Sequence, residues 1–361
     1  MKNFKLIGFL MILASSLLFI QCTSDTITGP QGTAGIDGID GLDGINGTDG
    51  INGVDGAGAA SCIACHSDSH RDGIESSYAM SGHANQTIMY DGSTLAEYGN
   101  RTYCAECHTN EGYIEFQETG AVAAEFANPT AISCTTCHDS HSTFDFENDG
   151  YDYALRNFDP VPLRKVNADY VIDYGDKSNA CITCHQPRTI PKLDADEAGV
   201  EDGFINVPNR YGPHYGAQSI LLEGIYGAEI AGSIVYPDAV SSAHRNGASC
   251  VSCHMGEPNE DDGQHTMNPT LNACVTCHGD GAEALMTNLQ AEIDGYMTEL
   301  EGLFETKGIL VDGSLVYDVD YPTVVADAYW NYRFVYYDHS HGVHNPAYTR
   351  ALLKNSIEAL Q

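Results

Sequence analysis

Six copies of Cys-x-x-Cys-His contain twelve of the thirteen cysteines in this chain. The attaching cysteines would be Cys62, Cys65, Cys104, Cys107, Cys134, Cys137, Cys181, Cys184, Cys250, Cys253, Cys274 and Cys277. Each pair is followed directly by a histidine: His66, His108, His138, His185, His254 and His278. This spacing is the attachment signature of c-type haem, in which both thiols bind the porphyrin covalently and the histidine ligates the iron. The sequence therefore predicts six covalently bound haem c groups.

Two other uses of paired cysteines were weighed against haem attachment. Six Cys-x-x-Cys pairs could in principle build three zinc sites with four cysteines each, but that leaves the six following histidines unexplained. Disulfides within a pair would close small, redox-labile loops and would not brace a fold. Haem attachment accounts for the cysteines and the histidines together.

Nine histidines lie outside the six motifs, an excess in a strongly acidic chain. Six irons with two axial ligands each need six further ligands, and bis-histidine ligation gives these histidines a purpose. Methionine is the alternative ligand, since Met80, Met89 and Met267 stand near candidate histidines.

The formal net charge is −34, from 50 acidic and 16 basic residues. Such a charge disfavours nucleic acid as a partner and favours a redox protein with a basic docking face, or an external electron acceptor. Negative charge near iron stabilises the ferric state, so we expect low reduction potentials.

Residues 1–21 are arranged as a secretory signal peptide, with two lysines before an apolar run. Cys22 follows the run and resembles the lipidated first residue of a bacterial lipoprotein, although Phe19 and Gln21 depart from the usual lipobox. The alternative is an incidental cysteine. We expect an exported lipoprotein of a Gram-negative bacterium, at the outer membrane or cell surface, with the periplasm as the alternative and the membrane contacted through the lipid anchor.

Residues 29–56 repeat Gly-x-y without a break, and Asp or Asn takes the third position in most repeats. A collagen-like triple helix needs this glycine spacing, but the tract has one proline and repelling carboxylates. We interpret residues 22–58 as an anchor and a polar stalk, with a trimerising stem as the alternative.

Residues 59–361 are left as a hexahaem domain, which we expect to be mainly α with extensive loops wrapped around the haems. Haems at this density should supply most of the buried apolar surface. An apolar stripe from Leu285 to Phe304 predicts a helix over 282–306, with Asp280 as its cap. A second helix after Pro322 and a third beginning at Pro346, capped by Asn345, would form a C-terminal hairpin.

Several segments resemble known multihaem cytochromes. The second half is similar to the superfamily of ammonia-forming nitrite reductase, hydroxylamine oxidoreductase and octahaem tetrathionate reductase in HYGAQSILLEG, HRNGASCVSCHM, HTMNPTLNACVTCH and HGVHNPAYTRALL. The first half resembles multihaem lipoproteins of Bacteroidota in SGHANQ, CAECHTNEGY and CTTCHDSHS. The resemblance implies six distal ligands: His83, His141, His214, His244, His265 and His344. His70, His339 and His341 then remain as spares.

The superfamily resemblance also raises a reductase as a hypothesis. Reduction of a small nitrogen or sulfur oxyanion at haem needs an open iron site, and the Cys-x-x-Cys-Lys motif of the nitrite reductases does not occur here. Because histidines suffice to close every iron, we expect an electron carrier without catalytic residues. The alternative is a reductase with one five-coordinate haem. The sequence does not decide between a monomer, an oligomer and a filament.

Overall fold

The computed structural model describes residues 62, 66–84, 92–141, 153–191, 200–201, 203–258 and 262–361. Contacts divide the chain into Met1–Val54 and Asp55–Gln361, and all described residues belong to the second unit. The predicted signal peptide, Cys22, the stalk and Cys65 lie outside the described residues.

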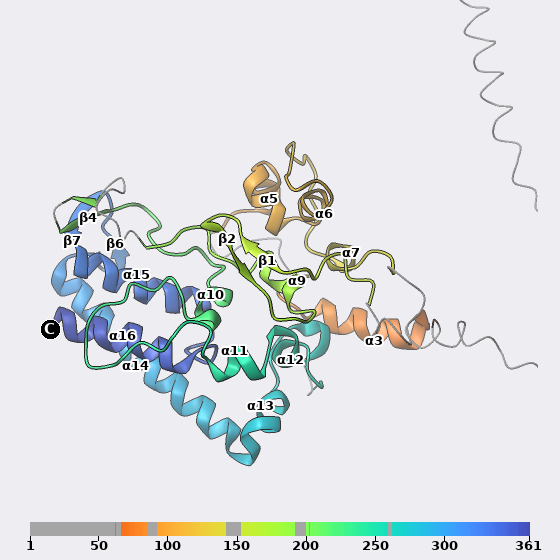
Figure 1. The fold of residues 1–361 in the computed structure, drawn as a ribbon. Helices are drawn as coiled ribbons and strands as arrows, with labels where there is room; N and C mark the ends of the chain where they lie inside the picture. Colours follow the sequence, from red (N-terminus) through yellow and green to blue (C-terminus); the bar gives the residue numbers. More distant parts are fainter. Residues whose placement is uncertain are drawn as a thin grey trace, which may run out of the picture. The chain divides into compact units, whose positions relative to one another are not determined.

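Helices dominate the regular structure, as expected (Figure 1). The shorter ones are α3 (Asp68–Ala79), α4 (Leu95–Gly99), α5 (Thr102–His108), α6 (Asn110–Thr119), α7 (Cys134–Cys137), α9 (Asn179–Ile182), α10 (Gln218–Glu223), α11 (Ala243–Gly247), α12 (Cys250–His254), α13 (Leu271–His278) and the 3₁₀ turns η2 (Gln264–Thr266) and η3 (Gly279–Gly281). Long loops connect them, so each short helix serves mainly to present a few side chains.

The strands are short and antiparallel. β1 (Val161–Leu163) pairs with β2 (Asn167–Ile172), and β5 (Leu310–Val311) pairs with β6 (Ser314–Leu315). A three-stranded sheet has the order β3-β4-β7, from β3 (Val200–Glu201), β4 (Phe204–Val207) and β7 (Val319–Pro322). This sheet joins the middle of the chain to the C-terminal helices.

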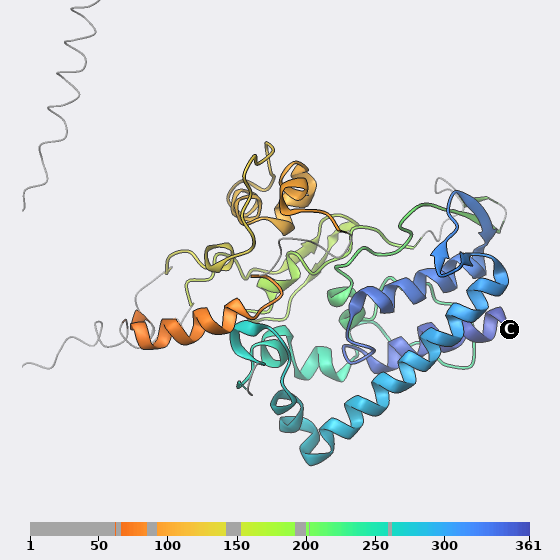
Figure 2. The same cartoon turned by 180° about the vertical axis from the view of Figure 1, so that it is seen from behind.

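Three long helices form the C-terminal part: α14 (Ala282–Lys307), α15 (Thr323–Asp338) and α16 (Pro346–Leu360). They lie side by side in both views (Figures 1 and 2). The expected α15–α16 hairpin is confirmed, and the Asn345 side chain accepts a hydrogen bond from the Tyr348 amide, as a cap should.

Two details of the predicted α14 are wrong. Asp280 does not cap it, because the chain makes the η3 turn first and Gly281 occupies the cap position without a side-chain bond. Leu285, in the first turn of α14, is 56% exposed. The rest of the stripe faces inward, and Ile293, Leu300 and Phe304 are fully buried.

The C-terminal part has an apolar core built from protein side chains, a feature that the sequence analysis did not predict. Its largest fully buried side chains are Trp330, Tyr348, Phe304 and Phe334. The Trp330 indole donates to the Tyr226 carbonyl at 3.0 Å, and the Asn331 amide bonds both backbone groups of Ala228 at 2.8 Å. The loop preceding α11 is thereby fixed to α15. Within the described residues, no helix has the length and hydropathy that crossing a bilayer requires.

Asp327 on α15 provides a test of this core. One of its carboxylate oxygens is buried without a hydrogen-bond partner, and burial raises the pKa of Asp327 to about 7. The folded state therefore holds a proton that the unfolded chain releases near pH 4, so stability falls as pH rises from about 4 through 7. We expect Asp327→Asn to raise stability at pH 8 by about 2–4 kcal/mol and to flatten its pH dependence.

Thermal unfolding between pH 4 and pH 8 measures this effect. The control is Asp280→Asn, which neutralises an exposed carboxylate. Equal pH profiles for Asp327→Asn and the unchanged protein would contradict the burial argument.

Candidate haem-binding sites

The five Cys-x-x-Cys-His motifs that the structure describes in full lie on or at the ends of short helices. Helices α5, α12 and α13 each end at the motif histidine, and α7 ends one residue before it. Residues three and four apart share one face of a helix. Both thiols and the histidine of a motif can therefore face one planar group.

Each motif histidine lies opposite a different histidine from elsewhere in the chain. The ring centres of every pair are separated by 6.0 to 6.4 Å. The pairs are His66–His141, His83–His185, His108–His214, His138–His265, His244–His278 and His254–His344. The six histidines implied as distal ligands are thus the six that face motif histidines.

This separation fits a metal ion held between two imidazoles. A metal–nitrogen bond to histidine is about 2.0 Å and each ring centre lies about 1 Å beyond its nitrogen, so the two centres should be about 6 Å apart. All six pairs meet that requirement, although they differ in sequence separation and local structure. The residues present therefore fit an axially ligated iron at each position.

Hydrogen bonds orient five of these twelve rings through Nδ1. The acceptors lie at 2.6 to 3.2 Å, and a ring bonded in this way carries its proton on Nδ1 and leaves Nε2 for a metal. The bonds run from His138 to the Tyr153 carbonyl, His185 to Gln218 Oε1, His244 to the Val343 carbonyl, His254 to the Met267 carbonyl and His344 to Asp338 Oδ1.

Burial favours the metal-binding protonation state of several rings. It lowers the pKa of His83 to about 4, with a further contribution from His185. Burial also lowers the pKa of His185, His254 and His265. These imidazoles are neutral near pH 7, which is the form that ligates metals.

His344 differs from the others because its partner is a carboxylate. Burial by itself lowers the pKa of His344, but the charge and hydrogen bond of Asp338 outweigh it and raise the pKa. Asp338 is only 2% exposed, and its other carboxylate oxygen accepts from the Ser340 hydroxyl and from the Ser340 amide at 3.2 Å. Asp338 was not predicted from the sequence, because a single Asp six positions before a histidine carries no recognisable signal.

A close backbone approach positions His214. This residue has φ +67°, in the left-handed region, and lies just before α10. A side-chain carbon on Gly216 would stand 2.2 Å from the Gln186 carbonyl oxygen, so only glycine permits this packing. The His214 segment is thereby held against the residue that follows the Cys181–His185 motif.

Three histidines take no part in the pairs. His70 is exposed on α3, and His339 ends α15 with its ring 6.1 Å from that of Tyr336. His341 bonds Asp294 Oδ1 at 2.5 Å on the surface. That these three histidines are spare ligands remains a prediction. Met267, a possible ligand by sequence, offers its carbonyl to His254 and has its sulfur against His83 Nδ1 at 2.8 Å.

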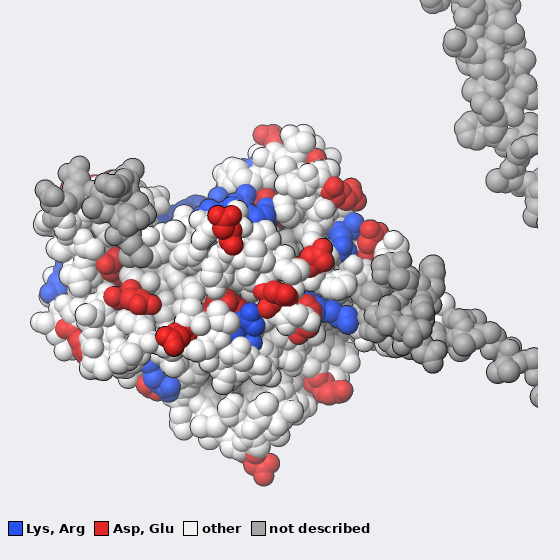
Figure 3. All heavy atoms as spheres, viewed as in Figure 1, with Lys and Arg blue, Asp and Glu red and all other residues white. Residues whose placement is uncertain are grey.

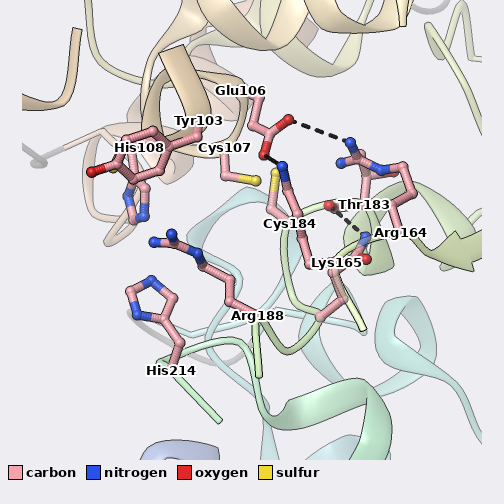
Figure 4. A pocket seen from close by; sticks show the side chains of 12 residues that line it. Tyr103, Glu106, Cys107, His108, Arg164, Lys165, Thr183, Cys184, Arg188 and His214 are labelled. Carbon is pink, nitrogen blue, oxygen red and sulfur yellow. Dashed lines mark hydrogen bonds and ion pairs between the residues drawn. The ribbon is translucent and has the colours of Figure 1, made fainter. Parts of the chain in front are cut away.

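The Cys181–His185 motif adjoins three other motifs. Its Cys184 thiol lies beside Cys107 (Figure 4), and its Cys181 thiol is within hydrogen-bonding reach of Cys250. Cys137 is close enough to interact electrostatically with both thiols of this motif. The Cys181–His185 motif is therefore central among those of the described residues.

The remaining motifs continue outward from this centre. His141, the partner of His66, stands three residues after His138 and so links the first and third motifs. At the other side, Cys253 lies near Cys274 and Cys277, and α12 packs against α13. In this series of contacts, the first and last motifs in sequence are the two ends.

Charged residues surround the Cys104–His108 motif. Glu106 accepts from Lys165 at 2.6 Å and from Arg164 at 3.3 Å, while Arg188 extends toward the gap between His108 and His214 (Figure 4). Over the face drawn in Figure 3, Asp and Glu are widely dispersed and Lys and Arg are fewer. Positive charge is thus placed at specific points of an acidic molecule.

Comparison with known proteins identifies the class of cofactor. No family model matches the chain. C-type polyheme cytochrome OmcB of Geobacter sulfurreducens is 29% identical over 283 residues, which are 69% of this chain and 33% of that protein. The chain is a relative of multihaem c-type cytochromes. Together with the six Cys-x-x-Cys-His motifs, this similarity supports covalently bound haem c as the cofactor, and the chain spans about a third of the length of the curated relatives it matches.

Solved structures resemble the chain less closely. The outer cell wall cytochrome OcwA is 20% identical with a TM-score of 0.48, covering 79% of this chain and 50% of that one. Cytochrome c nitrite reductase from Desulfovibrio desulfuricans is 17% identical with a TM-score of 0.38, covering 79% and 69%. Both scores are below 0.5, so the relationship is carried by sequence.

The hydrogen bond between Asp338 and His344 leads to a testable prediction. A carboxylate bonded to an axial histidine makes the ligand more electron-rich and favours ferric iron. We expect Asp338→Asn, which keeps an oxygen acceptor but removes the charge, to raise the midpoint potential of one haem. A tenfold change in its oxidised-to-reduced ratio at a set potential would be ~59 mV.

A spectroscopic redox titration of the haem-loaded protein measures the shift. Asp294→Asn is the matched control, because Asp294 bonds His341, which faces no motif histidine. Equal titration curves for the two variants would show that Asp338 does not act on a haem.

Proposed function

We propose that this chain is an exported hexahaem c-type cytochrome that carries electrons between redox partners along mostly bis-histidine haems. The observation that carries the proposal is the set of six opposed histidine pairs, one for each Cys-x-x-Cys-His motif. Six motifs predict six haems, and six pairs supply two axial nitrogens for each.

The haem groups supply one-electron chemistry when bound. The chain's own residues do the rest. Nδ1 hydrogen bonds orient several of the rings, burial lowers the pKa of His83, His185, His254 and His265, and the α14–α16 core fixes the loop that bears His344. Rigid ligation keeps structural change small between oxidation states, which suits a carrier.

The pairs support a carrier over a reductase. A reductase of small oxyanions needs an iron with one open position. In the described residues, every motif histidine has a second histidine opposite it, which could occupy that position. The alternative function would require one of these distal histidines to leave its place.

The contacts between motifs support a branched electron path. We infer an order from the Cys62 motif through the Cys134, Cys181 and Cys250 motifs to the Cys274 motif. The Cys104 motif joins as a branch through the contact between Cys107 and Cys184. The haem at Cys181 and Cys184 would then be the junction.

The remaining parts of the proposal come from the sequence. Residues 1–21 would direct export, Cys22 would carry a lipid, and residues 22–58 would hold the domain away from an outer membrane or cell surface. The partners would be redox proteins with a basic face, or an external acceptor, and not nucleic acid. A monomer, an oligomer and a filament are all compatible with this role.

Electron paramagnetic resonance tests the carrier proposal, with mass spectrometry to count the haems. We expect six haems, low-spin ferric signals alone and no carbon monoxide adduct after reduction. His265→Ala should open one iron and produce a high-spin signal, whereas His341→Ala should not. A strong high-spin signal in the unchanged protein that shifts with nitrite or hydroxylamine would favour the reductase instead.

Ligand replacement tests the branched path. Methionine ligation raises the potential of a haem, so His83→Met should let the junction haem be reduced first. Its added electron would then lower the potentials of nearby haems through Coulomb repulsion. We expect three neighbouring potentials to shift in this variant.

The matched control is His244→Met, which alters the outer haem at the Cys274 motif and should shift one neighbour. Nuclear magnetic resonance during a redox titration resolves the individual haems. An equal number of shifted neighbours in the two variants would contradict the junction.

A further inference from the structure

A cavity of about 350 Å³ adjoins His214, on the branch formed by the Cys104 motif. Three arginines line it together with tyrosines: Arg188, Arg210, Arg333, Tyr211 and Tyr337. No Asp or Glu is among its described lining residues, although the chain has 50 acidic and only 16 basic residues. The lining of the cavity is therefore positively charged, whereas the molecule as a whole is negatively charged.

Most other cations of the described residues are neutralised by the protein. Carboxylates lie within 4.0 Å of Arg71, Arg156, Arg164, Lys165, Arg245 and Arg350. Within the part of the chain that the structure describes, Arg188 and Arg333 have no such partner. They contact aromatic rings instead: Arg188 lies 5.1 Å from the centre of Tyr103, and Arg333 lies 4.2 Å from that of Tyr337.

The walls of the cavity are held in place. Arg333 belongs to α15 and donates to the Tyr337 hydroxyl. The Arg188 amide donates to the Pro213 carbonyl at 3.2 Å, and the Thr189 hydroxyl donates to the Gly212 carbonyl at 2.6 Å. A side-chain carbon on Gly212 would stand 3.0 Å from Arg333 Cβ, so the loop that contains Gly212 packs tightly against α15. The arginines are thus presented by a rigid frame.

We propose that this cavity binds a carboxylate through Arg188 and Arg333 and holds it beside His214. Guanidinium groups bind carboxylates with paired, charge-assisted hydrogen bonds, and the tyrosines provide aromatic walls for the rest of the ligand. The inference rests on the proposed function, because it places the anion next to a ligated haem. The carboxylate comes either from a propionate of that haem or from a free small aromatic acid.

Benzoate is the probe, and the haem-loaded Arg188→Gln/Arg333→Gln protein is the test. If the ligand is a free acid, benzoate binds the unchanged protein in calorimetry and shifts one haem potential, and the double variant binds at least tenfold more weakly. If it is a propionate, benzoate has no effect, and the double variant has one haem potential lowered, because lost positive charge favours ferric iron.

Arg350→Gln is the matched control, since it removes an arginine already paired with Glu292 and remote from the cavity lining. If the double variant does not fold, Arg188→Gln alone is tested in its place, because Arg188 is exposed and its replacement should not disturb the fold. Haem content and low-spin signals should be normal in every variant used. Titrations and benzoate binding that match those of Arg350→Gln would overturn the proposal. The separate failure of the proposed function would appear as high-spin haem in the unchanged protein.

Discussion

The opposition of two imidazoles across a gap of about one metal ion is the constraint on which this molecule depends. It joins segments that are far apart in the sequence, as in His83–His185, His108–His214 and His254–His344, whose members are about a hundred residues apart. The short helices and long loops before α14 become understandable in this light. They need only present thiols and rings in register, since the cofactor can provide the cross-links that strands and long helices provide elsewhere.

The C-terminal helices answer a different requirement. Their aromatic core around Trp330 and Phe334 is independent of any haem, and it fixes the connection that carries Asp338 and His344. A ligand held by a buried carboxylate on such a frame differs from ligands whose Nδ1 meets a backbone carbonyl, such as His244. The chain thus provides unequal surroundings for chemically identical groups, which is the means by which one protein can set several potentials.

Electrostatics adds a second inequality. An acidic molecule favours ferric iron generally, whereas Arg188 and Arg333 concentrate positive charge beside the His108–His214 pair. That pair belongs to the motif that leaves the main series of contacts as a branch. The position of the arginines and the order of the motifs are independent observations, and both distinguish the Cys104–His108 motif from the other five.

Much of the site was predictable from sequence because the chemistry is local. A motif of five residues predicts where haem is attached, periodic apolar residues predicted α14, and Pro322, Pro346 and the Asn345 cap predicted where α15 and α16 begin. Tertiary structure alone decided which histidine faces which motif, since partners such as His66 and His141 are set by the path of intervening loops. It also decided the roles of Asp338 and the arginine cavity, and the presence of an apolar core. These depend on contacts between distant segments, for which sequence spacing carries no periodic signal.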